Sequence, residues 1–171
     1  MYNDINYVSN VCFIESDKII IKDMEIDVIK TSHDASDSNG YIINCDNNSI
    51  VYITDTGYRN EKYHTKLLNK NVYIMESNHD IEMLNNGPYP YELRRRIYSD
   101  KGHLSNVDSA KYLADFIGDK TKCIMLAHLS EENNKPDIAY NTLVDKLNER
   151  DCLIDNIIVC QQNQETEFVE V

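Results

Sequence analysis

Short apolar segments separated by polar turns predict a β-sheet in the first half of the chain. Residues 11–14, 18–22 and 25–29 are rich in β-branched side chains and are joined by short polar links, which is typical of a meander. Further strands are predicted at residues 41–43, 50–53 and 72–75. The last of these is almost wholly apolar, as expected of a strand buried on both faces.

The spacing of apolar positions changes to that of helices in the second half. A helix is expected at residues 60–69, with Leu67 and Leu68 facing inward. Ser105, with Asp108 three positions later, is an N-terminal capping signal for another helix. The other predicted elements are helices at 81–85, 92–99 and 139–149 and strands at 123–126 and 157–159. Residues 1–171 therefore predict one α/β domain, a mixed sheet with helices packed on one face.

The composition is that of a soluble globular domain in the cytoplasm. The chain has 171 residues, 42% of them hydrophobic and 27% charged. Its apolar runs are far shorter than the roughly 20 residues of a membrane-spanning helix, and its first residues do not form a signal peptide. The five cysteines show no C-x-x-C spacing and are expected to be free thiols.

The net charge of −12 limits how the chain could bind nucleic acid. A protein that covers DNA phosphates with basic side chains is itself basic, so that mode of binding is disfavoured for the domain as a whole. A local basic patch or a metal site could still bind an anionic substrate.

Four of the five histidines fall where a predicted strand ends or a helix begins. They are His33, His79, His103 and His128. Ligands in α/β folds bind beyond the carboxyl ends of strands, so these loops could converge at one edge of the sheet. Asp55 has the same placement, and imidazole with carboxylate suits zinc, manganese or iron. Each histidine taken alone also fits a hydrogen-bonded loop or core residue, and His64 is expected on the solvated surface.

A series of motifs in a fixed order points to a family. They are YITDTGY (52–58), MESNHDIEML (75–84), NGPYP (86–90), RRI (95–97), SDKGHLSN (99–106) and LAHLSEENN (126–134). In this order, and over about residues 13–159, they resemble the WalJ (YycJ) branch of the metallo-β-lactamase fold. The resemblance implies an αββα sandwich, of which this chain would be the C-terminal part. It also implies a metal-dependent phosphodiesterase, with 5′→3′ DNA exonuclease activity in the complete form.

The resemblance also implies roles for individual residues. His33 would be a ligand of a first metal ion, Asp55 would bridge two ions, and His128 would be a ligand of the second. The ions would be zinc or manganese, and DNA rather than RNA would be the partner. His103 would be a catalytic histidine near the scissile phosphate, although it could also be a capping or packing residue. We expect His33, Asp55, His103 and His128 around one cleft.

Other residues of the motifs have less defined roles. His79 and Asp80 are expected near the site, with no role assigned. Arg94, Arg95 and Arg96 could contact phosphate, or could form a solvated helix face.

The superfamily signature His-x-His-x-Asp-His, which would supply four more ligands, does not occur in this sequence. We therefore expect the chain to bind metal weakly and to be inactive by itself. One face of the sheet would also lack a partner layer, which predicts self-association. The residues expected on that face are Val11, Phe13, Ile19, Ile21, Ile42, Val51 and Ile53.

Two classes of function stay open at this point. The first is a truncated metal-dependent hydrolase whose complete form cleaves phosphodiesters in nucleic acid. The second is a non-catalytic half-domain that acts as a binding or complementing module. Exonuclease, endonuclease and small-phosphodiester cleavage all fit the expected metal geometry, and lactamase or thioesterase activity also fits the fold.

Overall fold

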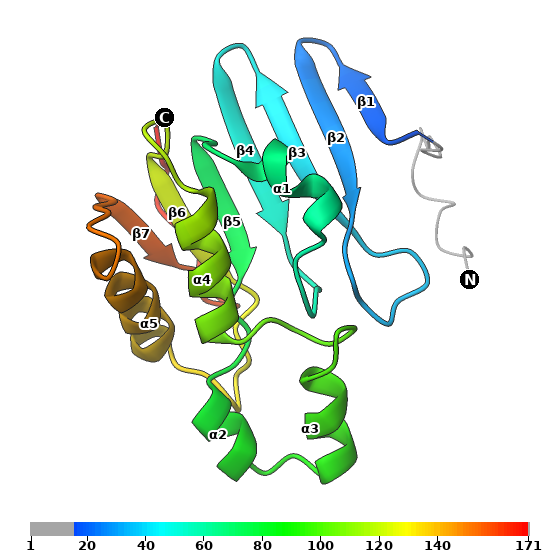
Figure 1. The fold of residues 1–171 in the computed structure, drawn as a ribbon, viewed down its shortest axis with the longest axis vertical. Helices are drawn as coiled ribbons and strands as arrows, with labels where there is room; N and C mark the ends of the chain where they lie inside the picture. The colour runs from blue at the N-terminus through cyan, green and yellow to red at the C-terminus, as the bar shows by residue number, and fades with distance from the viewer. Residues whose placement is uncertain (1–15, 171) are drawn as a thin grey trace.

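The computed structural model describes residues 16–170 and contains one seven-stranded sheet (Figure 1). The strands are β1 (Lys18–Ile21), β2 (Met24–Lys30), β3 (Asn39–Cys45), β4 (Asn48–Ile53), β5 (Val72–Glu76), β6 (Cys123–Ala127) and β7 (Asn156–Val159). Their order in the sheet is their order in the chain. Strands β1 to β4 pair antiparallel, whereas β4 to β7 pair parallel through helical crossovers.

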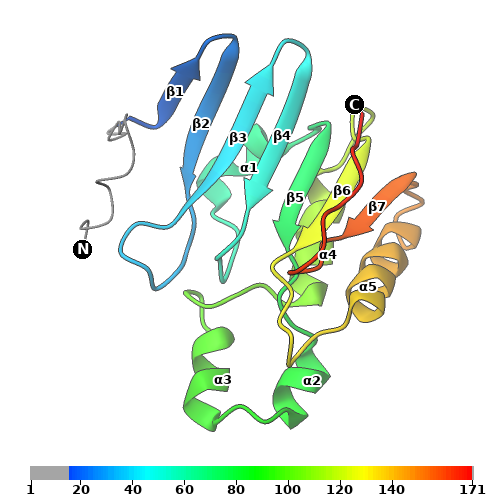
Figure 2. The same cartoon turned by 180° about the vertical axis from the view of Figure 1, so that it is seen from behind.

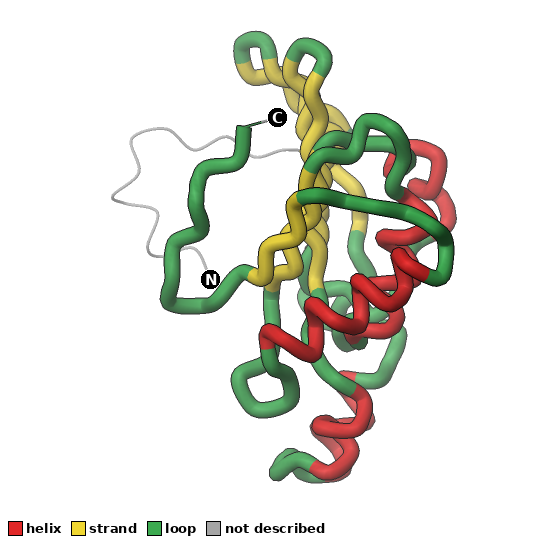
Figure 3. The backbone as a smooth tube through the Cα atoms, turned by 90° about the vertical axis from the view of Figure 1, so that its left-hand side faces the viewer, coloured by secondary structure: helices red, strands yellow, loops and turns green. Residues whose placement is uncertain are grey.

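The helices lie mainly on one face of this mixed sheet. They are a 3₁₀ turn η2 (Glu61–Tyr63) and helices α1 (His64–Leu67), α2 (Ile81–Asn86), α3 (Tyr91–Ile97), α4 (Asn106–Phe116) and α5 (Pro136–Asn148). Helices α1, α4 and α5 cover one face, and the segment after β7 runs on the other side (Figure 3). Helices α2 and α3 lie beyond the end of the sheet (Figures 1 and 2). The predicted mixed sheet with helices on one face is confirmed.

The core lies between the sheet and these helices. Ile42, Val51 and Ile53 share one buried cluster with Leu113 of α4 and Leu143 of α5. The prediction that Ile42, Val51 and Ile53 lie on an uncovered face is therefore wrong. Strand alternation shows that these residues share a face, but it does not show which face the helices cover. Val11, Phe13 and the strand predicted at 11–14 lie outside the described residues.

The opposite face of the sheet is also apolar. Tyr41 pairs with Val28 on one side and with Tyr52 on the other, and the row continues through Ile74 to Met125. These side chains alternate with those of the core and so point away from the helices. Tyr52 is 39% exposed. We call these five residues the outer row.

The prediction of a single helix at residues 60–69 is also wrong. The segment forms η2 and α1, and the chain becomes extended at Leu68, which is 38% exposed. His64 is half-buried rather than solvated, with its ring centroid 6.0 Å from that of Phe116. The predicted cap of α4 is confirmed, because Ser105 Oγ accepts a hydrogen bond from the Asp108 amide at 3.1 Å.

The topology places several strand ends along one edge of the sheet. Strands β2, β4, β5 and β6 run in the same direction, so their carboxyl ends share this edge. Loops that follow these strands are thereby brought together.

Two further features concern the chain as a whole. Cys45, Cys123, Cys152 and Cys160 are free thiols, whereas Cys12 lies outside the described residues. Among residues 16–170, no helix is both long enough and apolar enough to cross a membrane.

Candidate metal centre

Polar side chains from four segments meet at the shared edge of the sheet. Asp55 lies two residues after β4, Glu76 ends β5, and His128 follows β6 directly. His103 lies in the loop that leads into α4. Each of these four residues offers one potential ligand atom within 4.8 Å of the others. They form a possible site for a divalent metal ion.

Asp55 stands at the centre of the histidines. Its Oδ1 lies 3.7 Å from His33 Nε2, 3.7 Å from His128 Nε2 and 3.9 Å from His103 Nδ1. The structure therefore brings together His33, Asp55, His103 and His128. Asp55 and His128 both have left-handed backbone conformations, with φ of 53° and 58°. Such strain is uncommon outside glycine and is concentrated at functional sites.

Glu76 holds two of the histidines, His103 and His128, through hydrogen bonds. Its Oε1 accepts hydrogen bonds from His103 Nδ1 at 2.6 Å and from His128 Nδ1 at 2.7 Å. Its Oε2 accepts from the Thr56 amide at 3.0 Å and from the Leu104 amide at 3.4 Å. A carboxylate has room for about four such bonds. The lone pairs of Glu76 are therefore already used by protein donors, so Glu76 orients ligands instead of supplying one.

This hydrogen bonding fixes which imidazole nitrogen is free. His33 Nδ1 lies 3.0 Å from the Gly102 carbonyl oxygen, which can only accept. The three histidines thus each place Nδ1 on an acceptor, and Nε2 of His33 and of His128 faces Asp55. His33 Nε2 also lies 3.5 Å from Asp34 Oδ1. A metal-ligating histidine is held in the same manner by an acceptor behind it.

The negative charge of Glu76 and the positive charge of a protonated His128 stabilise each other. Burial alone would raise the pKa of Glu76, but the hydrogen bonds from His103 and His128 outweigh it and lower that pKa. The bond to Glu76 in turn raises the pKa of His128, against the opposing effect of burial. Glu76 therefore stays ionised although its exposed fraction is 0%.

The donor set fits a divalent metal ion. The Asp55 carboxylate and the Nε2 atoms of His33 and His128 that face it are the ligand types of zinc and manganese sites. The histidines are already oriented by acceptors, so little further ordering is needed on binding. His33 and Asp55 could hold one ion, and Asp55 and His128 a second.

His79 and Asp80 lie beside this cluster, in the loop after β5. His79 is 1% exposed, and its ring packs edge-on against Tyr98 with centroids 5.4 Å apart. Burial lowers the pKa of His79 to about 4, so the ring is neutral at physiological pH. Asp80 caps α2 by accepting a hydrogen bond from the Met83 amide at 2.8 Å.

The three arginines of α3 have different surroundings. Arg96 donates from Nε and Nη2 to the two carboxylate oxygens of Asp34 and lowers the pKa of that carboxyl to about 2. Arg94 donates to the Asn85 carbonyl and so ties α3 to α2. Arg95 is exposed. Arg96 is the member of the triplet that lines the cavity beside the histidines.

Buried amides hold the loops around the site in place. Asn134 donates to the carbonyl oxygens of Ser77 and Asn78 at 2.8 and 3.0 Å. Asn78 donates in turn to the His128 carbonyl at 2.9 Å. Gly57 lies so close to the backbone of residues 99 and 100 that an added Cβ would come within 2.5 Å. The Asp55 loop can therefore pack directly against the segment that carries His103.

Sequence reasoning missed Glu76. An acidic side chain at the end of a strand is usually solvated, so the pattern gave no reason to single it out. One signal was present, because Glu76 follows directly after the apolar strand at 72–75, where a buried charge requires partners.

Known proteins match both the sequence and the fold. No protein-family model matches the chain. It is 41% identical over 128 residues to exodeoxyribonuclease YycJ of Bacillus anthracis, which is 75% of this chain and 48% of that protein. It is also 41% identical over 129 residues to exodeoxyribonuclease WalJ of Streptococcus pneumoniae, with the same shares. The chain spans about half the length of the curated relatives it matches.

Solved structures share the fold at low sequence identity. The metallo-β-lactamase fold protein YhfI from Bacillus subtilis matches with a TM-score of 0.63 and 14% identity, over 88% of this chain and 51% of that one. A diphosphatase of the PhnP family matches with a TM-score of 0.55 and 13% identity, over 91% and 48%. The sheet and the helices on its face thus have the metallo-β-lactamase fold. Within that fold, the sequence is similar to WalJ and YycJ, so the predicted resemblance to that branch is confirmed.

Replacing the buried carboxylate tests the anchoring of the histidines. Glu76→Gln puts an amide NH₂ where donors converge, and losing charged hydrogen bonds should cost about 2–3 kcal/mol of unfolding free energy. The pKa of His128 should fall, because the Glu76 hydrogen bond is the main cause that raises it. A raised histidine pKa stabilises the fold below its ordinary value of 6.5, and this contribution is lost as the pH rises through the raised value. Urea unfolding and NMR titration of His128 measure both effects.

Glu82→Gln, on the exposed surface of α2, is the matched control. It should leave both the unfolding free energy and the pKa of His128 unchanged. An unchanged His128 pKa in Glu76→Gln would show that Glu76 does not anchor this histidine.

Proposed function

We propose that this chain belongs to a metal-dependent hydrolase that cleaves phosphodiester bonds in DNA, as an exodeoxyribonuclease does. The observation that carries the proposal is the cluster of His33, Asp55, His103 and His128 with their oriented nitrogens. The names of the curated relatives, exodeoxyribonucleases YycJ and WalJ, support DNA as the substrate.

We assign His33, Asp55 and His128 as metal ligands, with Asp55 shared between two ions. A divalent ion bound there would polarise a phosphodiester and lower the pKa of a bound water. Zinc and manganese both suit the donor set. Weak binding, and inactivity of the chain by itself, stay predictions.

His103 is proposed as the proton donor to the leaving oxygen. Its Nδ1 is held 2.6 Å from Glu76 Oε1, so Nε2 can face a substrate. The cytoplasmic location stays a prediction, consistent with the four free thiols of the described residues.

The metal assignment predicts that Asp55→Ala weakens ion binding at least tenfold, because Asp55 is the carboxylate that the histidine nitrogens share. Titration of Zn²⁺ or Mn²⁺ by calorimetry gives the affinity directly. Asp119→Ala, in the exposed loop after α4, is the control and should bind like the unchanged chain. Equal affinities in Asp55→Ala and Asp119→Ala would refute the metal assignment.

The reaction is tested in a form of the chain extended upstream by a half that carries His-x-His-x-Asp-His, because the chain by itself is expected to be inactive. With metal in excess, release of nucleotides by this extended form from 5′-labelled single- and double-stranded DNA should require both the ion and Asp55. An extended, metal-loaded form that neither binds the labelled DNA nor releases nucleotides from it would count against a nuclease.

The outer row supports a second proposal, that of a binding module. Val28, Tyr41, Tyr52, Ile74 and Met125 form an apolar band across five strands. Val28 is buried, whereas Tyr41, Ile74 and Met125 are half-buried and Tyr52 is exposed. An apolar band that reaches the surface in this way is typical of an interaction site. We propose that two copies of the chain associate through this face. A two-fold interface uses the same surface of both copies, and the outer row could supply that surface.

Self-association predicts a mass that rises with concentration. Sedimentation velocity at up to about 50 µM should show dimers, since weak interfaces fill in this range. Tyr52→Glu puts a charge into the outer row and should give monomers. Tyr91→Glu, on α3 and 67% exposed, should not. A monomer at every concentration would rule out this interface.

A further inference from the structure

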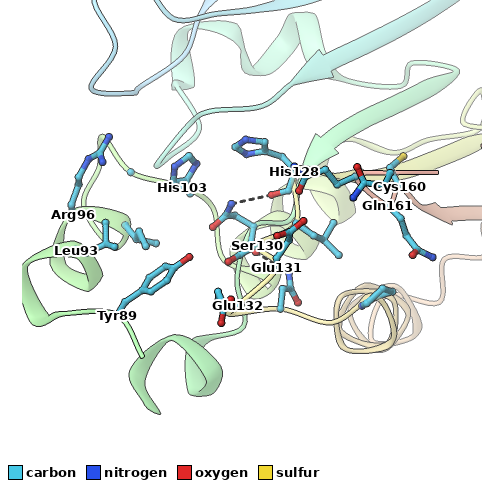
Figure 4. Close-up of a pocket in the computed structure, with 18 of the residues that line it drawn as sticks. Tyr89, Leu93, Arg96, His103, His128, Ser130, Glu131, Glu132, Cys160 and Gln161 are labelled. Atoms are coloured by element: carbon cyan, nitrogen blue, oxygen red, sulfur yellow. Dashed lines mark hydrogen bonds between the residues drawn. The ribbon is translucent and has the colours of Figure 1, made fainter. Parts of the chain in front are cut away.

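A cavity of about 1010 Å³ opens directly beside the histidine cluster (Figure 4). His33, His103 and His128 line one part of it. Ligand pockets have volumes of about 300–1,000 Å³, so this cavity has room for more than a phosphate group. Whatever reacts at the histidines must also place its remaining atoms in this space.

The walls of the cavity differ in chemistry. Figure 4 shows Arg96 and the histidines along one side, and Tyr89 and Glu132 along the opposite side. Tyr89 and Leu93 line the cavity and are half-buried, so they offer a ring face and an apolar side chain. Arg96 is on α3, as Leu93 is, but lies on the histidine side.

This arrangement sorts the parts of a nucleotide. The carboxylate of Glu132 lines the cavity on the side of Tyr89 and repels a phosphate from that side. The same carboxylate can accept a hydrogen bond from the amino group of a nucleobase. A phosphate is therefore favoured at the histidine side and a base at the side of Tyr89.

From this geometry we infer that Tyr89, with Leu93 beside it, stacks on the nucleobase of the nucleotide whose phosphate lies at the histidines. The inference rests on the proposed function for the identity of the substrate. Stacking on a tyrosine requires a flat π-face and tolerates any base, so the ring by itself does not select one base over another. Tyr89 is a specificity-determining residue that separates nucleotides from simple phosphate esters.

The test measures binding without metal and without turnover. With a chelator present, a deoxynucleoside 5′-monophosphate (dAMP) and inorganic phosphate are each titrated by NMR. In the unchanged chain, the amide signals of Tyr89 and Leu93 should shift with dAMP and not with phosphate.

Tyr89→Ala should weaken the binding of dAMP about tenfold and leave the binding of phosphate unchanged, because it removes only the stacking face. Tyr89→Phe keeps the ring and should bind dAMP like the unchanged chain. Tyr91→Ala removes a neighbouring exposed tyrosine outside the cavity lining and is the control.

The outcomes separate this inference from the proposed function. Tyr89-dependent dAMP binding supports the subsite even when no DNA is cleaved, in which case the nuclease proposal alone fails. If dAMP binds no better than phosphate, or binds equally in Tyr89→Ala, the subsite is wrong even where metal-dependent cleavage is observed.

Discussion

The site depends on one buried carboxylate. Glu76 has an exposed fraction of 0%, and a charge in that position is tolerated only when it is fully hydrogen-bonded. Its partners come from three separate segments: the loop after β4, the loop before α4, and the residue after β6. The hydrogen bonds that the Glu76 carboxylate requires therefore bring these segments together. The free nitrogens of His103 and His128 are a direct consequence.

The sheet provides the frame for this interaction. Because β2, β4, β5 and β6 run in one direction, the segments that carry His33, Asp55, Glu76 and His128 end at one edge. The helices cover one face and stabilise the frame, whereas the outer row leaves the other face apolar. Rigid strands hold the site more accurately than loops alone could, and the amides of Asn78 and Asn134 fix the remaining loops.

Part of this arrangement could be predicted from the sequence. Placement at strand ends and helix starts brought His33, His79, His103 and His128 together with Asp55 into one candidate site, because position relative to a strand determines the edge that a residue occupies. The family resemblance then assigned the site to His33, Asp55, His103 and His128. Glu76 escaped prediction because its role depends on partners 27 and 52 positions away in the chain. The prediction that Ile42, Val51 and Ile53 face away from the helices was wrong. Alternation of side chains along a strand separates two faces of the sheet, but it does not show which face the helical crossovers will cover. The prediction of one helix over residues 60–69 was wrong because the backbone becomes extended at Leu68 and ends the helix there.

The most direct test of this account is the tautomer of each histidine, read from the ¹⁵N chemical shifts of the imidazole rings after titration to their neutral form. If Glu76 and Gly102 orient the site, His33, His103 and His128 carry their protons on Nδ1 and have unprotonated Nε2 atoms. Addition of Zn²⁺ should then shift the Nε2 signals of His33 and His128. Protons found on Nε2 of His103 and His128 would contradict the anchoring role of Glu76 and, with it, the account of the site.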